Sequence, residues 1–103
     1  MMDITAQELS EKIKRKESFI LIDVREPFEH LEFNIGGDLA SLQTMLSAKI
    51  IELDKRKEDE IVLYCRSGNR SALAKQLFIN AGFKNVRNLL GGMIHWKELY
   101  DKG

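Results

Sequence analysis

The chain contains a single cysteine, and the residues after it could stabilise a negative charge on its sulfur. Cys65 ends the apolar run "IVLYC", and Arg66 and Arg70 follow it closely. The thiolate is the nucleophilic form of cysteine, and nearby cations lower the thiol pKa. The alternative is a buried cysteine that packs as a small apolar residue. The two arginines and the polar loop favour an activated nucleophile at Cys65.

Ser67, Gly68 and Asn69 lie between the two arginines. Gly68 permits a tight turn and Asn69 tolerates unusual backbone angles, so successive N–H groups of the loop can point at one anion. A helix predicted to begin at Asn69 adds its own free N–H groups and the positive end of its dipole. We therefore expect the loop from Arg66 to Arg70 to bind an anionic sulfur and its substrate.

Neither histidine indicates a second reactive group. A Cys–His pair requires an imidazole within hydrogen-bond reach of the thiol. His30 and His95 each lie among apolar and aromatic neighbours near a predicted helix, so we interpret both as structural. One cysteine and two histidines also make a poor zinc site. We predict neither a metal nor a cofactor.

Three apolar segments are predicted to be strands, and the segments around them predict helices. Unbroken hydrophobicity in residues 19–24 and 61–65 is typical of strands covered on both faces, as in a parallel sheet. The third predicted strand is 86–90, and the predicted helices are 6–14, a short helix near Pro27, 41–56, 69–80 and 93–100. Alternation of strands and helices predicts an α/β domain with a mainly parallel sheet. Cys65 would then lie at the carboxyl edge of that sheet, where ligands bind.

Composition bounds the remaining possibilities. With 103 residues, the chain is long enough for one domain, 1–103, but too short for two. Acidic and basic residues balance at 16 each, which argues against nucleic acid or an anionic membrane as a partner. The N-terminus is too acidic for a signal peptide, and no apolar run is long enough to span a bilayer. We expect a cytoplasmic monomer with a reduced thiol.

Three segments together resemble the rhodanese-like sulfurtransferases: "LIDVREPFEH", "CRSGNRS" and "LLGGMIHW", in the order and spacing of that family. The resemblance implies a three-layer α/β/α domain. It also implies that Cys65 takes a sulfane sulfur from a donor such as thiosulfate and holds it as a persulfide. The acceptor would be cyanide, a small thiol or a protein thiol, because the chain has no second cysteine to resolve the persulfide.

The resemblance also assigns roles to residues around the nucleophile. Arg66 and Arg70 would bind the anionic part of the donor. Asp23, Arg25 and Glu26 match the "DVRE" element of the family, and we interpret them as an ion-pair and hydrogen-bond brace beside the site.

One segment departs from the family pattern. Relatives often carry Gly-His-Ile-x-Gly-Ala after the first signature, where this chain has "FNIGGDLA". Asn34 replaces the histidine and Asp38 replaces the alanine, which puts the local packing in question.

Two other functions remain open. Cysteine-dependent phosphatases and arsenate reductases also hold an anion between a cysteine and an arginine, but with five residues between them. Here four residues separate Cys65 from Arg70, and Ser71 stands where a phosphatase has arginine. A non-catalytic binding or regulatory module of the same family is the second alternative. Such modules commonly lack the cysteine.

Overall fold

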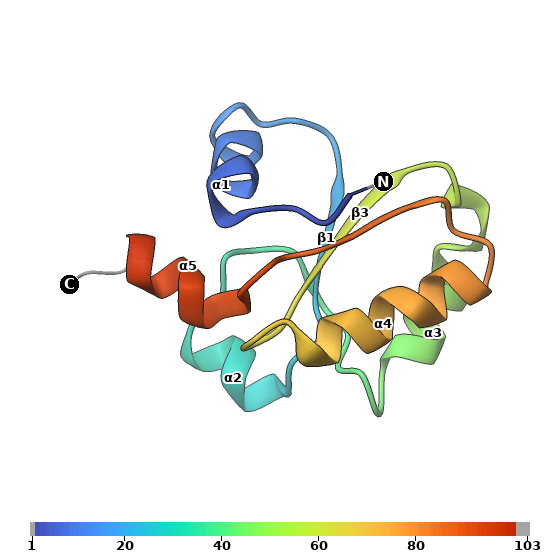
Figure 1. The fold of residues 1–103 in the computed structure, drawn as a ribbon. Helices are drawn as coiled ribbons and strands as arrows, with labels where there is room; N and C mark the ends of the chain where they lie inside the picture. Colours follow the sequence, from blue (N-terminus) through green and yellow to red (C-terminus); the bar gives the residue numbers. More distant parts are fainter. Residues whose placement is uncertain (1, 101–103) are drawn as a thin grey trace.

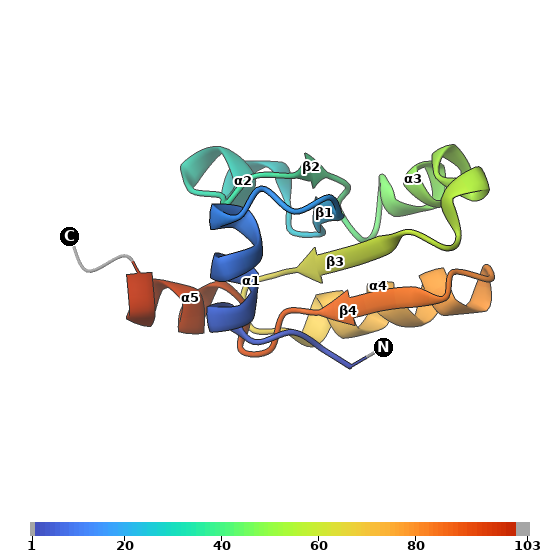
Figure 2. The ribbon, with the colours of Figure 1, turned by 90° about the horizontal axis from the view of Figure 1, so that it is seen from above.

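The computed structural model describes residues 2–100, and a parallel four-stranded sheet lies at its centre. The strands are β1 (Ile20–Asp23), β2 (Asp38–Leu39), β3 (Glu60–Tyr64) and β4 (Asn85–Asn88). Figure 2 shows them side by side in the order β2-β1-β3-β4. The predicted parallel sheet is confirmed, and strands β1 and β3 end next to each other, with Asp23 opposite Tyr64.

Helices cover both faces of the sheet. They are α1 (Ala6–Lys14), α2 (Pro27–Glu32), α3 (Leu46–Glu52), α4 (Asn69–Asn80) and α5 (Gly92–Tyr100), with a 3-10 turn, η1, at Asp54–Arg56. Figure 1 shows α1 and α5 on one side of the strands and α3 and α4 on the other. This is the predicted three-layer α/β/α domain. No helix within residues 2–100 is long and apolar enough to cross a membrane.

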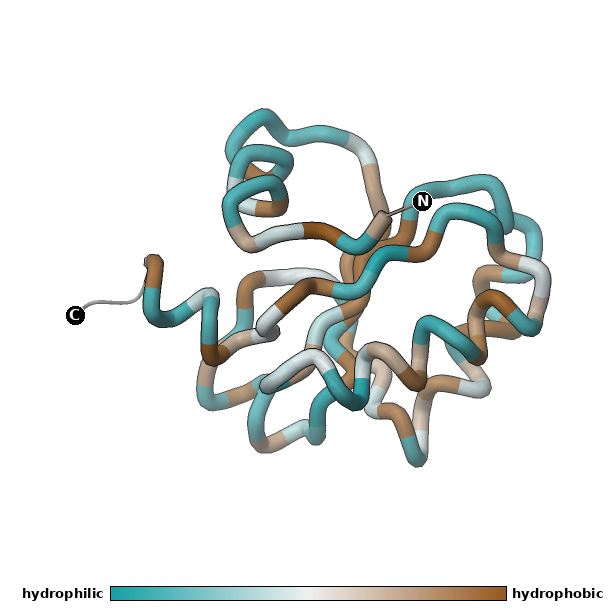
Figure 3. Tube along the Cα trace, viewed as in Figure 1, coloured by the Kyte–Doolittle hydropathy of each residue, from teal (hydrophilic) through white to brown (hydrophobic). Residues whose placement is uncertain are grey.

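Strand β3 divides the core in two because successive side chains of a strand point to opposite faces. Ile61, Leu63 and Cys65 belong to the apolar cluster that α3 and α4 cover. Val62 and Tyr64 belong to the cluster covered by α1 and α5. Figure 3 shows that the most hydrophobic segments run through the centre of the molecule. The alternation therefore turns the cysteine side chain towards the layer that contains α4.

The segment after the first strand differs from its prediction. Residues 41–56 were expected to form one helix, but α3 begins only at Leu46 and ends at Glu52. The backbone N–H groups of Ala40 and Leu42 instead bond to the carbonyls of Asp23 and Val24, at 2.8 and 3.1 Å. This extended pairing also includes β2, a strand of two residues that no hydrophobic pattern predicted. Pairing with the edge of β1 thus overrides the local helical spacing.

Candidate active site

Cys65 follows β3 directly and precedes the first turn of α4. Gly68 is the N-cap residue of that helix, and its φ of +103° is a left-handed conformation that favours glycine. The loop can therefore reverse direction over very few residues. Asn69, by contrast, is already helical and does not need the unusual backbone angles that the sequence allowed it.

Three donors point at the cysteine sulfur. The backbone N–H of Gly68 lies 3.0 Å from Sγ, and Ser71 contributes its N–H at 3.4 Å and its hydroxyl at 3.3 Å. Complete burial raises the pKa of Cys65, but the hydrogen bonds from Ser71 and Gly68 outweigh it, so the thiol pKa lies below its usual value. The loop thus favours the thiolate form of Cys65 at the carboxyl edge of the sheet.

Ser71 is a site residue that sequence reasoning missed. The predicted anion loop ended at Arg70, yet Ser71 is fully buried against the sulfur from the first turn of α4. Its hydroxyl also faces Oδ1 of Asn88, whose amide nitrogen donates to the carbonyl of Gly68 at 3.1 Å. A hydroxyl carries one proton, so Asn88 and the sulfur compete for it. One signal in the sequence could have indicated this role. Ser71 lies in the first turn of the helix predicted to begin at Asn69, where backbone N–H groups are free to bind an anion.

The two arginines of the loop have different surroundings. Both terminal nitrogens of Arg70 donate to the carboxylate of Glu29, at 2.7 and 3.0 Å. This bidentate bond, together with a backbone N–H, lowers the pKa of Glu29 to about 2 despite its partial burial. Arg66 is exposed and has no ion-pair partner among residues 2–100. The guanidinium of Arg66 is therefore open to an anion, whereas an anion would have to compete with Glu29 for Arg70.

A buried ion pair lies beside the loop, at the end of the neighbouring strand. Asp23 accepts hydrogen bonds from Nε and Nη2 of Arg25 at 2.9 and 2.8 Å, and from Nδ1 of His30 at 2.9 Å. Arg25 also donates to the carbonyl of Phe33 at 2.6 Å, so the cluster ties the end of β1 to the C-terminal end of α2. Among residues 2–100, the hydrogen bonds of Sγ involve no histidine.

Glu26 and Asn34 fix the two ends of α2. Glu26 is the N-cap residue, and its backbone N–H donates to the carboxylate of Glu29 at 3.0 Å. Asn34 donates to the carbonyl of His30 and accepts from the N–H of Gly36, both at 2.9 Å. Asparagine thus closes the helix at the position where relatives have histidine, and the departure from the family pattern leaves the local hydrogen bonds satisfied.

The first residues of α5 hold the cysteine loop in place through backbone hydrogen bonds. The N–H groups of Met93 and Ile94 donate to the carbonyls of Cys65 and Arg66 at 2.9 and 3.0 Å. Gly92 has a φ of +56°, and a Cβ atom there would lie 2.5 Å from the Arg66 carbonyl oxygen. Only glycine permits this close approach. The residues of the last signature therefore position the backbone of Cys65, although within residues 2–100 none of the hydrogen bonds to its sulfur comes from them.

Comparison with known proteins agrees with this architecture. The model of the Rhodanese-like domain family matches residues 5–99. The chain is 39% identical over 95 residues to the putative sulfurtransferase YtwF of Bacillus subtilis, covering 92% of this chain and 89% of that protein. It is 33% identical to the adenylyltransferase and sulfurtransferase UBA4 of Candida albicans, but spans only 24% of that longer protein.

A solved structure shows the same likeness. The human single-domain sulfurtransferase TSTD1 superposes with a TM-score of 0.78 at 25% identity, covering 93% of this chain and 95% of that one.

Proposed function

The chain belongs to the family of rhodanese-like domains, and on this premise we propose that it is a sulfurtransferase that carries sulfane sulfur on Cys65. The observation that carries the proposal is the set of three hydrogen bonds from Gly68 and Ser71 to a buried sulfur at the end of β3. Such donors stabilise an anion without a proton-accepting base. They suit both a thiolate and the persulfide that would replace it.

Thiosulfate is the proposed model donor. The Cys65 thiolate attacks the outer sulfur, a new S–S bond forms, and the S–S bond of thiosulfate breaks with its electron pair leaving on sulfite. The enzyme is left as a persulfide anion, so charge is conserved and no external oxidant is needed. The unpaired guanidinium of Arg66 is the group we assign to the leaving sulfite.

The acceptor must come from outside the chain. No second cysteine exists to displace the sulfur from Cys65. A nucleophile such as cyanide or a thiolate attacks the outer sulfur, and the electron pair of the broken bond returns to Sγ. The N–H groups of Gly68 and Ser71 stabilise the released thiolate. We call these groups and the Ser71 hydroxyl the cradle, and the same cradle serves both the loading of sulfur from the donor and its transfer to the acceptor.

Ser71 also favours sulfur over phosphate chemistry. It occupies the position of the phosphatase arginine, and its hydroxyl is committed to Cys65 and Asn88. The cradle therefore lacks a guanidinium at the place where a phosphatase binds the oxygens of its substrate. This contact supports sulfur transfer and argues against the phosphatase alternative.

Mass spectrometry after treatment with thiosulfate tests the proposal. We expect one additional sulfur atom on the wild-type protein, stable until cyanide is added and then released as thiocyanate. Cys65→Ser should lower thiocyanate formation by at least about 1,000-fold, since the nucleophile is lost. Ser67→Ala is the matched control, because it keeps the backbone N–H of the loop and removes an exposed hydroxyl that makes no hydrogen bond to Sγ within residues 2–100. Absence of the added sulfur with thiosulfate and with persulfide donors would contradict a catalytic role.

A further inference from the structure

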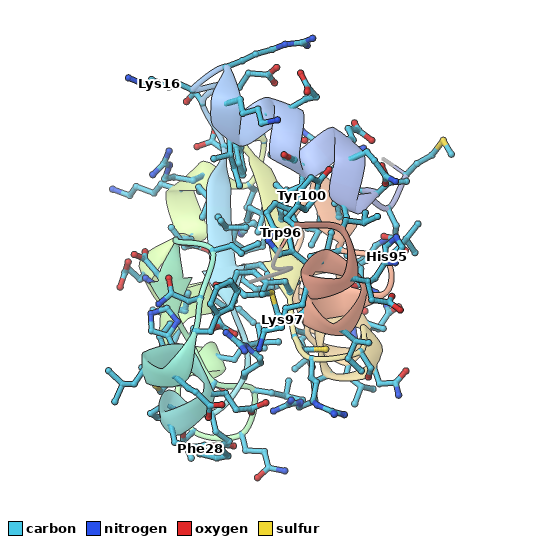
Figure 4. The ribbon with its side chains drawn as sticks, turned by 90° about the vertical axis from the view of Figure 1, so that its left-hand side faces the viewer. Lys16, Phe28, His95, Trp96, Lys97 and Tyr100 are labelled. Atoms are coloured by element: carbon cyan, nitrogen blue, oxygen red, sulfur yellow. The ribbon has the colours of Figure 1, made fainter. Side chains whose placement is uncertain are left out.

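A cleft of about 290 Å³ lies between α2 and α5, beside the sulfur-binding loop. Its walls include Phe28 and Glu32 from α2, Ile94 and Lys97 from α5, and Arg66 from the loop. Figure 4 shows Lys97 on the side of α5 that faces α2, whereas His95 lies on the opposite side. Its volume suits a ligand the size of an amino acid or a very small peptide.

The cleft is held in a fixed position relative to the nucleophile. Ile94, one of its wall residues, donates its N–H to the carbonyl of Arg66, the residue next to Cys65. The preceding N–H, of Met93, donates to the carbonyl of Cys65 itself. A molecule in the cleft therefore lies against the loop that carries the reactive sulfur.

Some charges that line the cleft are already neutralised. Arg25 is paired with Asp23, and Glu29 with Arg70. Within residues 2–100, however, Arg66, Lys97 and Glu32 form no ion pair. The Nζ atom of Lys97 lies over the ring of Phe33, 4.9 Å from its centroid, which leaves its positive charge available at the wall.

The unpaired charges are divided between the two walls. The cations, Arg66 and Lys97, come from the loop and α5, whereas the carboxylate of Glu32 comes from α2. Apolar side chains such as Phe28 and Ile94 lie between them. A small anion such as thiosulfate or cyanide would pair with the cations and leave Glu32 without a partner. A zwitterion satisfies all three charges.

We propose that this cleft is the binding site of the sulfur acceptor, and that the acceptor is a small thiol with both an ammonium and a carboxylate group, as in free cysteine. The carboxylate binds Arg66 and Lys97, the ammonium binds Glu32, and the thiol faces Cys65. This inference rests on the proposed sulfurtransferase function. It adds the chemical class of the acceptor and the residues that select it.

The transfer step balances without a further reagent. The acceptor thiol first loses its proton to solvent, and its thiolate attacks the outer sulfur of the Cys65 persulfide. A new S–S bond forms to the acceptor while the bond to Sγ breaks, and that electron pair remains on Cys65 as a thiolate. The acceptor leaves as a persulfide, and the N–H groups of Gly68 and Ser71 stabilise the released sulfur anion.

Four acceptors separate the contributions of the two charges. The protein is loaded with sulfur and mixed with L-cysteine, with cysteamine, which has only the ammonium, with 3-mercaptopropionate, which has only the carboxylate, or with 2-mercaptoethanol, which has neither. The rate of persulfide loss is measured for wild type, Lys97→Gln and Glu32→Gln. For each acceptor the variant is divided by wild type, which cancels the intrinsic reactivity of the thiol, and 2-mercaptoethanol provides the baseline.

We expect Lys97→Gln to slow transfer to L-cysteine and 3-mercaptopropionate by about two- to five-fold against that baseline, and to leave the ratio for cysteamine at one. Glu32→Gln should slow transfer to L-cysteine and cysteamine by a similar factor and spare 3-mercaptopropionate. The control is Lys84→Gln, which removes an exposed lysine paired with Glu58 and lies outside the cleft. All of its ratios should equal one.

Two negative results are distinguishable. If the loaded protein transfers sulfur to all four thiols with variant ratios that do not depend on acceptor charge, the cleft assignment is wrong and the sulfurtransferase function stands. If no donor loads Cys65, the proposed function fails and the acceptor site fails with it.

Discussion

Two buried anionic groups lie at the ends of neighbouring strands, and the protein stabilises them in different ways. At the end of β1, Asp23 is bonded to the full charge of Arg25 and to His30. After β3, the sulfur of Cys65 accepts hydrogen bonds from the neutral N–H and hydroxyl groups of Gly68 and Ser71. The carboxylate of Asp23 is thus neutralised by the charge of Arg25, whereas a negative charge on Cys65 would be stabilised by neutral dipoles.

We infer from this difference that the thiol, and not the carboxylate, is the group suited to react. A bidentate guanidinium occupies the lone pairs of a carboxylate and fixes its position, which suits a brace. Dipolar donors lower the pKa of a thiol while leaving it free to form a new bond to sulfur. We infer that the brace maintains the fold beside the site and that the dipolar cradle sustains the chemistry.

Removing the charge of Asp23 should have the largest effect on stability. Asp23→Asn leaves the guanidinium of Arg25, 4% exposed, without its carboxylate. Breaking a buried pair from one side costs about 3 kcal/mol, so the midpoint of urea unfolding should fall markedly. The control is Asp54→Asn, which breaks an exposed pair with Lys57 and should cost less than about 1 kcal/mol. Equal losses would mean that the brace is not a buried electrostatic unit.

Ser71→Ala should affect the cradle more than the brace. Loss of the hydroxyl removes the side-chain hydrogen bond from Ser71, one of the hydrogen bonds that lower the Cys65 pKa, so that pKa should rise. The rate of alkylation by iodoacetamide as a function of pH reports this directly, since only the thiolate reacts. Its midpoint should move to higher pH, and the rate near neutral pH should fall by up to about ten-fold.

Ser67→Ala is the matched control for this experiment, because it removes a neighbouring hydroxyl that does not contact Sγ. An unchanged profile in Ser71→Ala, or an equal shift in both variants, would mean that the serine hydroxyl does not stabilise the thiolate.

The ion pair between Glu29 and Arg70 should produce a smaller, pH-dependent effect. Arg70 lowers the pKa of Glu29 from 4.5 to about 2, so the stabilisation is present above pH 4.5 and is lost as the pH falls towards 2. Because Arg70 is about one-third exposed, we expect Glu29→Gln to cost only about 1 kcal/mol near neutral pH. Unfolding free energies of the two proteins should converge near pH 2. A constant difference across this range would exclude the carboxylate as its source.

The same variant sharpens the role of Arg70. Glu29→Gln releases the guanidinium from its carboxylate, so the KM for thiosulfate should decrease by about two- to five-fold if Arg70 can bind the donor. An unchanged KM would indicate that Arg70 serves only to fix the loop to α2.

Sequence patterns predicted the helix bounds correctly where the capping residues and the apolar spacing lie within the helix segment itself or next to it. The predicted helix 6–14 matches α1, whose first turn is capped by Thr5: its Oγ1 accepts from the N–H of Glu8 at 3.1 Å. The bounds of α4 were also predicted correctly, because apolar spacing and the glycines on either side define them. In contrast, residues 41–56 failed as a single helix, since their first part bonds to a strand distant in sequence.

The sequence alone was enough to predict the order of β1, β3, β4 and the helices around them, the position of Cys65 after a buried strand, and the loop that turns N–H groups towards it. These features depend on hydrophobic period, glycine and helix starts, which act over a few residues. Only the tertiary structure decided that Glu29 binds Arg70, that Ser71 faces the sulfur, and that a charged cleft opens between α2 and α5. Those relations join side chains from different elements, and packing alone sets their distances.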